Sequence, residues 1–390
     1  MSNLLGSREF ELLRACCAAL PQSASSAGLG TLIGSVVDWV EFRRLAEHHG
    51  VGPLVYRNLP SLLQPIPSPI LDQLRSDCEG NAQKSLLLAQ ELLEILACLE
   101  SAGIPAIPFK GPVLAQDVYG DISLRRFADL DILIRAADIP RAKLAVRELC
   151  YAPAFSLNET QERAYLKSAS EWPFDGPRGT NLLELQWQIL PRFYSVDFCI
   201  ENFFRRASVV DIGDKKVLTL SPEDLLLVLC VHGAKHFWSR LLWMCDIAAT
   251  VRLKSIDFDF VFRAAADLGI VRIIAVNFWL LNELFGIPFP PQLHGKRLEG
   301  DSEVGRLAQM AWEVLSGGLE YKTPSIDYFR SMLRLRERLQ DKLRFLLRLV
   351  FTPSIGEWSV VRLPAFFSPL YYGIRLYRLA GRFTPRAVAK

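Results

Sequence analysis

Two aspartates, one residue apart, open the segment Asp129-Leu-Asp-Ile-Leu-Ile134. The segment alternates polar and apolar residues at first and ends apolar, which predicts a β-strand. Side chains along a strand point to alternate faces, so Asp129 and Asp131 share one face about 7 Å apart. Two carboxylates at this spacing disfavour each other's ionisation unless a cation lies between them, and their oxygens suit Mg²⁺. The pair predicts a divalent-cation site, although a solvated strand face would contain the same residues.

A third carboxylate, Glu184, lies in a second predicted strand, residues 181–187. The opposite face of that strand is apolar, with Leu183, Leu185 and Trp187. Three carboxylates from two adjacent strands can hold two metal ions, and two-metal sites serve in-line phosphoryl displacement. We therefore expect Asp129, Asp131 and Glu184 to form one metal-binding, catalytic cluster.

A second Asp-x-Asp pair, Asp257 and Asp259, provides a comparison within the same chain. It directly precedes the helical segment 260–268, so one of its aspartates is expected to be an N-cap. It has no glycine turn before it and no strand after it, whereas the pair at 129 and 131 has both. Only the first pair is a candidate for chemistry.

Lys110, Gly111 and Pro112 form a turn between the apolar segment 104–109 and a predicted helix that ends near residue 119. A glycine at this place lets backbone N–H groups approach a phosphate at the helix N-terminus, and Lys110 could add a positive charge. An ordinary strand–helix turn with a solvated lysine would contain the same residues. Both interpretations stay open at this point.

Arg125 and Arg126 lie just before the acidic strand. They could clamp a triphosphate or offset the aspartates, and a solvated loop is equally compatible with them.

His232, Lys235 and His236 share one stripe of a predicted helix that follows an apolar run at 225–231. A zinc site would need a third ligand that the sequence does not offer. The simplest interpretation is a packed helix whose histidines are satisfied by hydrogen bonds. The alternative interpretation is that the three side chains face a cleft.

The apolar periodicity predicts an α+β fold, in which a small mixed β-sheet is flanked by N-terminal and C-terminal helical regions. Residues 52–70 are rich in proline and are expected to be loop-like. The main predicted elements are helices at 10–20, 39–49, 85–102, 139–149 and from 222 onward with Ser221 as N-cap, and a hairpin at 209–220. The expected regions are an N-terminal helical region (1–103), an α/β core (104–220), a C-terminal helical domain (221–350) and a basic, aromatic, proline-punctuated tail (351–390).

The charge of the chain is unevenly spread. Residues 331–390 contain 12 Lys and Arg against 3 Asp and Glu, whereas residues 1–330 contain 33 against 39. Arg334, Arg338 and Lys342 have the spacing of one solvated helix face, and the basic end of the chain could also meet an anionic membrane surface. A nucleic-acid partner is not expected, because the rest of the chain is acidic. The absence of a signal peptide and the scattered cysteines favour a cytoplasmic protein, peripheral to a membrane at most.

The glycine turn, the Asp-x-Asp strand and the later strand carboxylate together resemble the nucleotidyltransferase superfamily of the polymerase β type. More narrowly, the chain resembles the bacterial family called uncharacterised nucleotidyltransferase. The residues that carry the resemblance are Lys110-Gly111, Tyr119, Arg125, Asp129, Asp131, Glu184 with Trp187, and a His-x-x-Lys-His-x-Trp pattern that is followed by Asp246-Ile-Ala248.

The resemblance implies an enzyme that moves NMP from an NTP such as ATP to a hydroxyl or phosphate acceptor, with Mg²⁺ or Mn²⁺. Asp129, Asp131 and Glu184 would then bind metal, and Glu184 could act as base. The nucleotide would contact Lys110, Gly111, Arg125, Lys235 and His236. The acceptor, which could be a small molecule, a peptide or a protein, is not specified. A binding or scaffold protein on a degenerate transferase fold is the alternative, and Gln186 and the Gly111-Pro112 turn, which depart from the family pattern, favour it.

Overall fold

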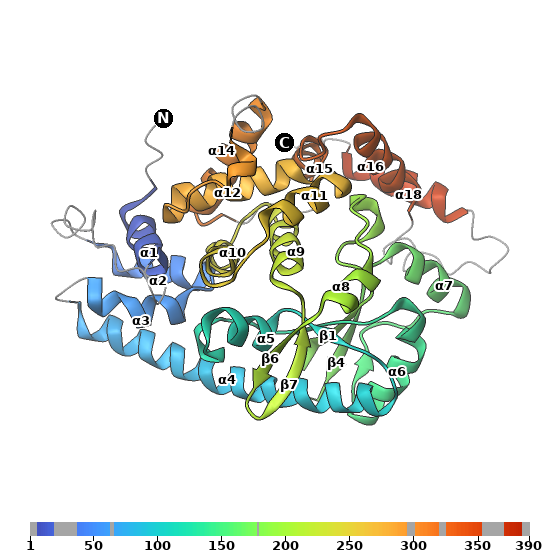
Figure 1. The fold of residues 1–390 in the computed structure, drawn as a ribbon, viewed down its shortest axis with the longest axis horizontal. Coiled ribbons are helices and arrows are strands. Elements are labelled where there is room, and N and C mark those ends of the chain that lie inside the picture. The colour runs from blue at the N-terminus through green and yellow to red at the C-terminus, as the bar shows by residue number, and fades with distance from the viewer. Residues whose placement is uncertain are drawn as a thin grey trace, which may run out of the picture.

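A five-stranded mixed sheet surrounded by helices confirms the expected α+β class (Figure 1). The structure is a computed structural model that describes residues 6–18, 37–62, 66–177, 179–294, 301–319, 325–352 and 370–383. The long helix α4 runs along one side of the molecule, and the later helices lie on the other side of the sheet.

The N-terminal part of the chain is helical, with α1 (Arg8–Ala18), α2 (Trp39–His48), α3 (Gly52–Leu62) and α4 (Ser68–Ser101). The prediction of a loop at 52–70 was wrong, because α3 occupies most of that segment. Gly52 and Pro53 open this helix, and a proline in the first turn removes an N–H that would have no helical partner. Leu54, Val55 and Leu59 are buried and hold α3 against its neighbours.

The sheet has the strand order β1-β2-β5-β4-β3, and β2 and β5 run parallel whereas the other pairs are antiparallel. The strands are β1 (Ile107–Pro108), β2 (Leu130–Leu133), β3 (Ala152–Pro153), β4 (Glu171–Gly176) and β5 (Gly179–Gln186). The two strands predicted at 129–134 and 181–187 are confirmed, but β2 begins at Leu130, so Asp129 lies just before the strand. Strands β3 and β4 and the helix α7 (Glu159–Ser168) between them were not predicted.

The two faces of the sheet have different roles. Leu130 and Ile132 of β2 and Leu183 and Leu185 of β5 are buried in one core, which includes residues of α4 and α6 (Ile139–Glu148). The residues between them point to the other face, so the apolar alternation that buries the leucines also presents Asp131 and Glu184 on the side of the C-terminal helices.

A short helix precedes a β-hairpin, and the remaining helices follow it; the hairpin and the helices after it were predicted from the sequence. The elements are α8 (Ile200–Arg206), β6 (Ser208–Ile212), β7 (Lys215–Thr219), α9 (Pro222–Lys235), α10 (Leu241–Leu253), α11 (Phe258–Leu268), α12 (Val271–Phe285), α14 (Ser302–Ser316), α15 (Ile326–Arg334), α16 (Leu339–Phe351) and α18 (Leu370–Phe383). Ser221 caps α9 and Asp257 caps α11, so both N-cap predictions are confirmed. Helices α8 to α16 of this set share a second hydrophobic core with α1, α2 and α3, whereas Tyr371 of α18 is buried in the first core.

The basic end of the chain differs from the expectation of one solvated helix face. Helix α15 ends at Arg334 and α16 begins at Leu339, so Arg334, Arg338 and Lys342 do not lie on one helix. Arg336 between the two helices and Arg375 on α18 are buried. Residues 353–369 and 384–390 of the predicted tail lie outside the described residues.

A buried ion pair joins the segment before β2 to the C-terminal helices. The Arg125 guanidinium donates two hydrogen bonds to the Asp246 carboxylate on α10, from Nε to Oδ1 at 3.0 Å and from Nη2 to Oδ2 at 3.0 Å. The Tyr119 hydroxyl donates to the same carboxylate at 2.9 Å, and all three side chains are buried. Such a bidentate pair fixes orientation as well as distance. It therefore holds the segment 125–129 in a fixed place against α10.

We predict that Asp246→Asn lowers the free energy of unfolding by about 3–5 kcal/mol, because it leaves the Arg125 cation buried without a counter-charge. Urea denaturation of both proteins measures the change. Asp267→Asn, at an exposed position on α11, is the control and should change stability by less than about 0.5 kcal/mol. A loss below about 1 kcal/mol for Asp246→Asn would show that the pair does not organise the fold.

Candidate active site

A pocket of about 260 Å³ lies between the polar face of the sheet and helix α9. Its polar lining consists of Lys110, Asp129, Asp131, Glu171, Glu184, Gln186, His232, Lys235 and His236. The structure thus brings the three predicted carboxylates together with Lys110, Lys235 and His236, which were predicted from distant parts of the chain.

The strand register places the carboxylates side by side. Asp131 of β2 lies opposite Glu184 of β5 in the parallel ladder, and Glu171 of β4 lies opposite Gln186 of β5. Glu171 is a fourth carboxylate that the sequence reasoning missed. The signal for it is the apolar Trp172 and Phe174, which alternate with polar or small residues and both point into the core behind the sheet.

A hydrogen-bonded network links these side chains. Lys110 Nζ lies 3.1 Å from Asp131 Oδ1 in an ion pair whose side chains are 16% and 2% exposed. Gln186 Nε2 donates to Asp131 Oδ1 at 2.7 Å and to Glu184 Oε2 at 3.1 Å. Gln186 therefore fixes the two carboxylates relative to each other, and Lys110 supplies the positive charge nearest to them.

The crowding of the carboxylates changes their acidity. Burial, followed by repulsion from Glu171, Asp131 and Asp129, raises the pKa of Glu184 to about 8. Burial and the charge of Asp131 also raise the pKa of Asp129. Burial alone would lower the pKa of Lys110, but the nearby carboxylates, Asp131 first among them, raise it above its ordinary value. The negative charge of the cluster therefore exceeds its positive charge, and Lys110 stays protonated as the cation beside it.

The histidines of α9 form the opposite wall of the pocket. Burial and the charge of Lys235 lower the pKa of His236 to about 3, and burial with the charge of Lys110 lowers that of His232 well below its ordinary value. Both imidazoles are therefore neutral near pH 7. Their rings contact each other and the Trp243 ring, at centroid distances of 4.7 to 5.2 Å. They can exchange hydrogen bonds with a ligand but do not add charge to the pocket.

Gly111 and Arg125 contribute to the site from outside the pocket lining. Gly111 has φ +57°, and a Cβ there would lie 3.3 Å from the Asp129 carbonyl oxygen, so the turn passes close to the segment that enters β2 only because the residue is glycine. Arg125 is not brought into the pocket. Its guanidinium is bound to Asp246, so its place corresponds to a positioning role and not to the predicted nucleotide contact.

The donors have the chemistry for a hard divalent cation, because carboxylate oxygens are the ligands that Mg²⁺ prefers. However, the carboxylates are not arranged to enclose a metal ion. Among the described residues, no three His, Cys, Asp or Glu side chains converge closely enough to enclose a metal ion. Lys110 is bonded to Asp131 Oδ1 instead, so a metal that uses this oxygen would have to displace the lysine.

The chain is similar to a protein family and to a solved structure. The model of one protein family, described as uncharacterised nucleotidyltransferase, matches residues 35–286. A search of curated proteins found no match. A solved structure, an antigenic nucleotidyltransferase-like protein from Paracoccidioides brasiliensis, is similar to this chain at 16% identity and a TM-score of 0.29. That comparison covers 52% of this chain and 91% of the other.

We predict that the metal-free protein loses stability between about pH 5 and pH 8, because the raised pKa of Glu184 makes the folded state hold a proton that the unfolded chain has already released. The stabilisation by this proton is complete below the pKa that Glu184 has in the unfolded chain. It disappears as the pH rises through the pKa of Glu184 in the folded protein. Glu184→Gln should remove this pH-dependent part, roughly 1–3 kcal/mol after allowance for solvent.

Urea denaturation at several pH values, in buffer without divalent metal, measures the difference between the wild type and Glu184→Gln. Glu148→Gln, an exposed glutamate at the end of α6, is the control and should follow the wild type. Parallel pH profiles of the wild type and Glu184→Gln would contradict the prediction.

Proposed function

The chain belongs to the uncharacterised nucleotidyltransferase family, and we propose that it transfers NMP from an NTP to a hydroxyl or phosphate acceptor in a reaction that depends on Mg²⁺ or Mn²⁺. The observation that carries the proposal is the convergence of Asp129, Asp131 and Glu184 from neighbouring strands on one pocket. A buried cluster of this kind repels anions unless a cation is bound, which suits a site that admits nucleotide together with metal.

Asp129, Asp131 and Glu184 would hold the metal once Lys110 has left Asp131. Bound there, a divalent cation would neutralise charge on the transferring phosphoryl group and orient it. Lys110, once released, can contact a phosphate oxygen from the same side of the pocket, and Lys235 lies across from it on α9. Gln186 keeps its hydrogen bonds to the two carboxylates and preserves their spacing.

Glu184 is the residue best placed to accept a proton. In the metal-free site its pKa is raised to about 8, and a divalent cation bound beside it would lower this pKa, so that the carboxylate is ionised and able to accept a proton. In the transfer, the acceptor oxygen forms a bond to the α-phosphorus as its proton passes to Glu184. The bond from that phosphorus to the bridging oxygen breaks, and pyrophosphate leaves with the electron pair.

We predict that Asp129→Asn/Asp131→Asn weakens ATP binding in the presence of Mg²⁺ at least about tenfold and reduces NMP transfer at least about a hundredfold, because both charges that retain the metal are lost. Calorimetry with ATP and Mg²⁺, and label transfer from α-labelled NTPs to a mixture of acceptors, measure the two effects.

The matched control is Asp257→Asn/Asp259→Asn, the second Asp-x-Asp of the chain. Asn also serves well as an N-cap, so this variant should keep its helix, bind ATP and retain activity. The enzymatic proposal fails if the wild type does not bind ATP with Mg²⁺, or if the two double variants behave alike.

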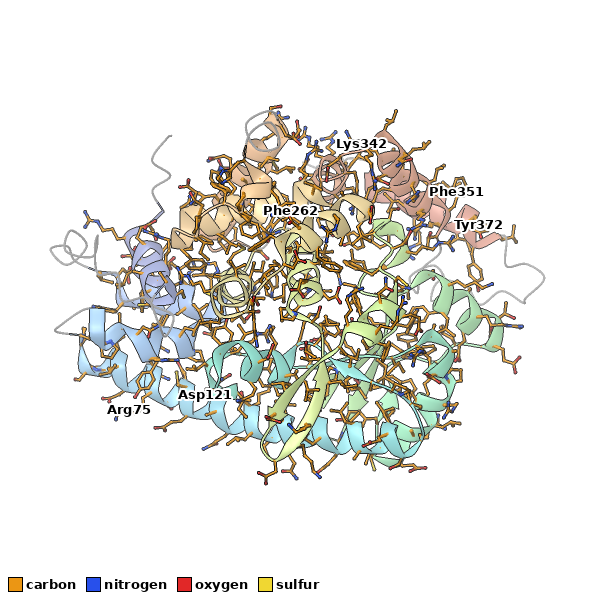
Figure 2. The ribbon with its side chains drawn as sticks, viewed as in Figure 1. Arg75, Asp121, Phe262, Lys342, Phe351 and Tyr372 are labelled. Carbon is orange, nitrogen blue, oxygen red and sulfur yellow. The ribbon has the colours of Figure 1, made fainter. Side chains whose placement is uncertain are left out.

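A second candidate function is attachment to an anionic membrane surface through α16 and α18, which contact each other. Leu339, Leu343, Leu346 and Leu347 form an exposed stripe on α16, with Leu339 81% exposed. Phe351 of α16 contacts Tyr372 of α18, and both side chains are exposed at the outer edge of the molecule (Figure 2). No described helix is both long and apolar enough to cross a bilayer, so contact would be at the surface.

The positive charge next to this leucine stripe favours an anionic membrane surface. Lys342 and Arg344 stand between the exposed leucines, and each basic residue near an anionic leaflet adds about 1 kcal/mol of attraction. An apolar stripe flanked by cations is the pattern of a helix that lies in the headgroup region.

We predict that the protein floats with vesicles that contain phosphatidylserine and less with phosphatidylcholine alone, and that Leu343→Gln/Leu347→Gln reduces flotation because the inserted apolar area is lost. Val40→Gln, which changes an exposed apolar residue on α2, should float like the wild type. Flotation that is absent, or equal in all variants, would remove this candidate.

A further inference from the structure

A second and larger pocket, of about 880 Å³, lies between the N-terminal helices and the segment that leads into the catalytic strand. Its walls come from α2, the start of α3, the first half of α4, residues 126–128 and the start of α10. Its volume is in the range of pockets that take small molecules, whereas the carboxylate pocket is smaller than that range.

The lining of this second pocket is basic. It contains four basic residues, Arg43, Lys84, Arg126 and Arg240, and two acidic residues, Glu47 and Asp77. Lys84 and Arg126 are exposed and have no ion pair or hydrogen bond to the described residues, and Arg43 is 3.8 Å from Asp77. The carboxylate pocket has the opposite balance, with four carboxylates against Lys110 and Lys235. Two neighbouring pockets of opposite charge suit two different ligands.

The two pockets share a wall. Ala128 lines the basic pocket and the next residue, Asp129, lines the carboxylate pocket, so the two linings are one residue apart, or about 4 Å along the chain. Trp243 lines the basic pocket and its ring contacts His232 and His236, which line the carboxylate pocket. A molecule in the basic pocket would therefore lie beside the carboxylate pocket, with residues 128–129 and the Trp243 ring between the two.

We propose that the basic pocket binds the acceptor of the transfer and that this acceptor carries a phosphate group. The inference rests on the proposed function, because that function requires a second substrate beside the NTP. Arg and Lys side chains such as Lys84 and Arg126, which have no ion pair to the described residues, are suited to phosphate oxygens, to which they donate charge-assisted hydrogen bonds. The acidic pocket would reject such a group in the absence of metal, so the phosphate binds in the basic pocket while the reacting oxygen of the acceptor approaches Asp129 and Glu184.

Calorimetry can measure the binding of glucose 6-phosphate and inorganic phosphate, with uncharged glucose for comparison. The measurements are made without divalent metal and at constant ionic strength. Both anions should bind more tightly than glucose. Lys84→Gln and Arg126→Gln should each weaken this binding about 3-fold or more, and the double variant about 10-fold or more, because each removes a charge-assisted hydrogen bond. Lys167→Gln and Arg147→Gln, at exposed positions on α7 and α6, are the matched controls and should bind as the wild type does.

Gly80 offers a steric test that leaves the charges unchanged. It lines the basic pocket from the middle of α4, and a Cβ placed there would have no other atom within 4 Å. Gly80→Leu should fill this space and reduce phosphate binding, whereas Gly80→Ala should preserve binding. Both substitutions also favour the helix, so loss of binding would not come from loss of fold.

The inference is overturned if the two anions bind no better than glucose, or if the charge variants and Gly80→Leu bind them as the wild type does. ATP with Mg²⁺ is the separate arm of the test. If Lys84→Gln/Arg126→Gln weakens ATP binding by the same factor, the pocket holds the nucleotide's own phosphates and the assignment to an acceptor is wrong. The transfer reaction is tested separately, by ATP binding to the Asp129 and Asp131 variants. A failure of the proposed function can therefore be distinguished from a failure of the acceptor site.

Discussion

The ion pair between Arg125 and Asp246 is the interaction on which the two pockets depend. It is buried, bidentate and reinforced by the Tyr119 hydroxyl, and it joins the segment before β2 to helix α10. The four residues after Arg125 line both pockets, since Arg126 to Ala128 face the basic one and Asp129 the acidic one. A buried pair of this kind adds little net stability but strongly restricts geometry. It sets where the catalytic strand begins relative to the helices that complete the site.

The formal charge of +3 conceals an uneven distribution of charge around this segment. The sheet face concentrates four carboxylates that Lys110 and Lys235 offset only in part. The surplus positive charge lies elsewhere, some of it in the second pocket and some at the end of the chain. Part of that end is buried, as Arg336 and Arg375 show, so its basic residues do not all face solvent.

The sequence predicted those parts of the site that depend on local pattern. The alternation of leucines on β2 and β5 was sufficient to place Asp131 and Glu184 on one face, because strand periodicity is a local property. Lys110, Lys235 and His236 were predicted from the family resemblance, and they line the same pocket. Glu171 was missed because its strand, which contains Pro173, was not recognised from the sequence. Arg125 was assigned to the nucleotide because nothing near it in sequence indicated Asp246, a partner 121 residues away.

The sequence by itself therefore determined the carboxylates, the strands that present them and the helix caps, since these follow from periodicity and neighbouring residues. Only the tertiary structure decided which side chains meet: Lys110 with Asp131, Gln186 with both carboxylates, and Arg125 with Asp246. It also decided that the N-terminal helices and α10 enclose a basic pocket beside the acidic one. These contacts join segments far apart in the chain, and packing of the two hydrophobic cores, which no local pattern encodes, sets their geometry.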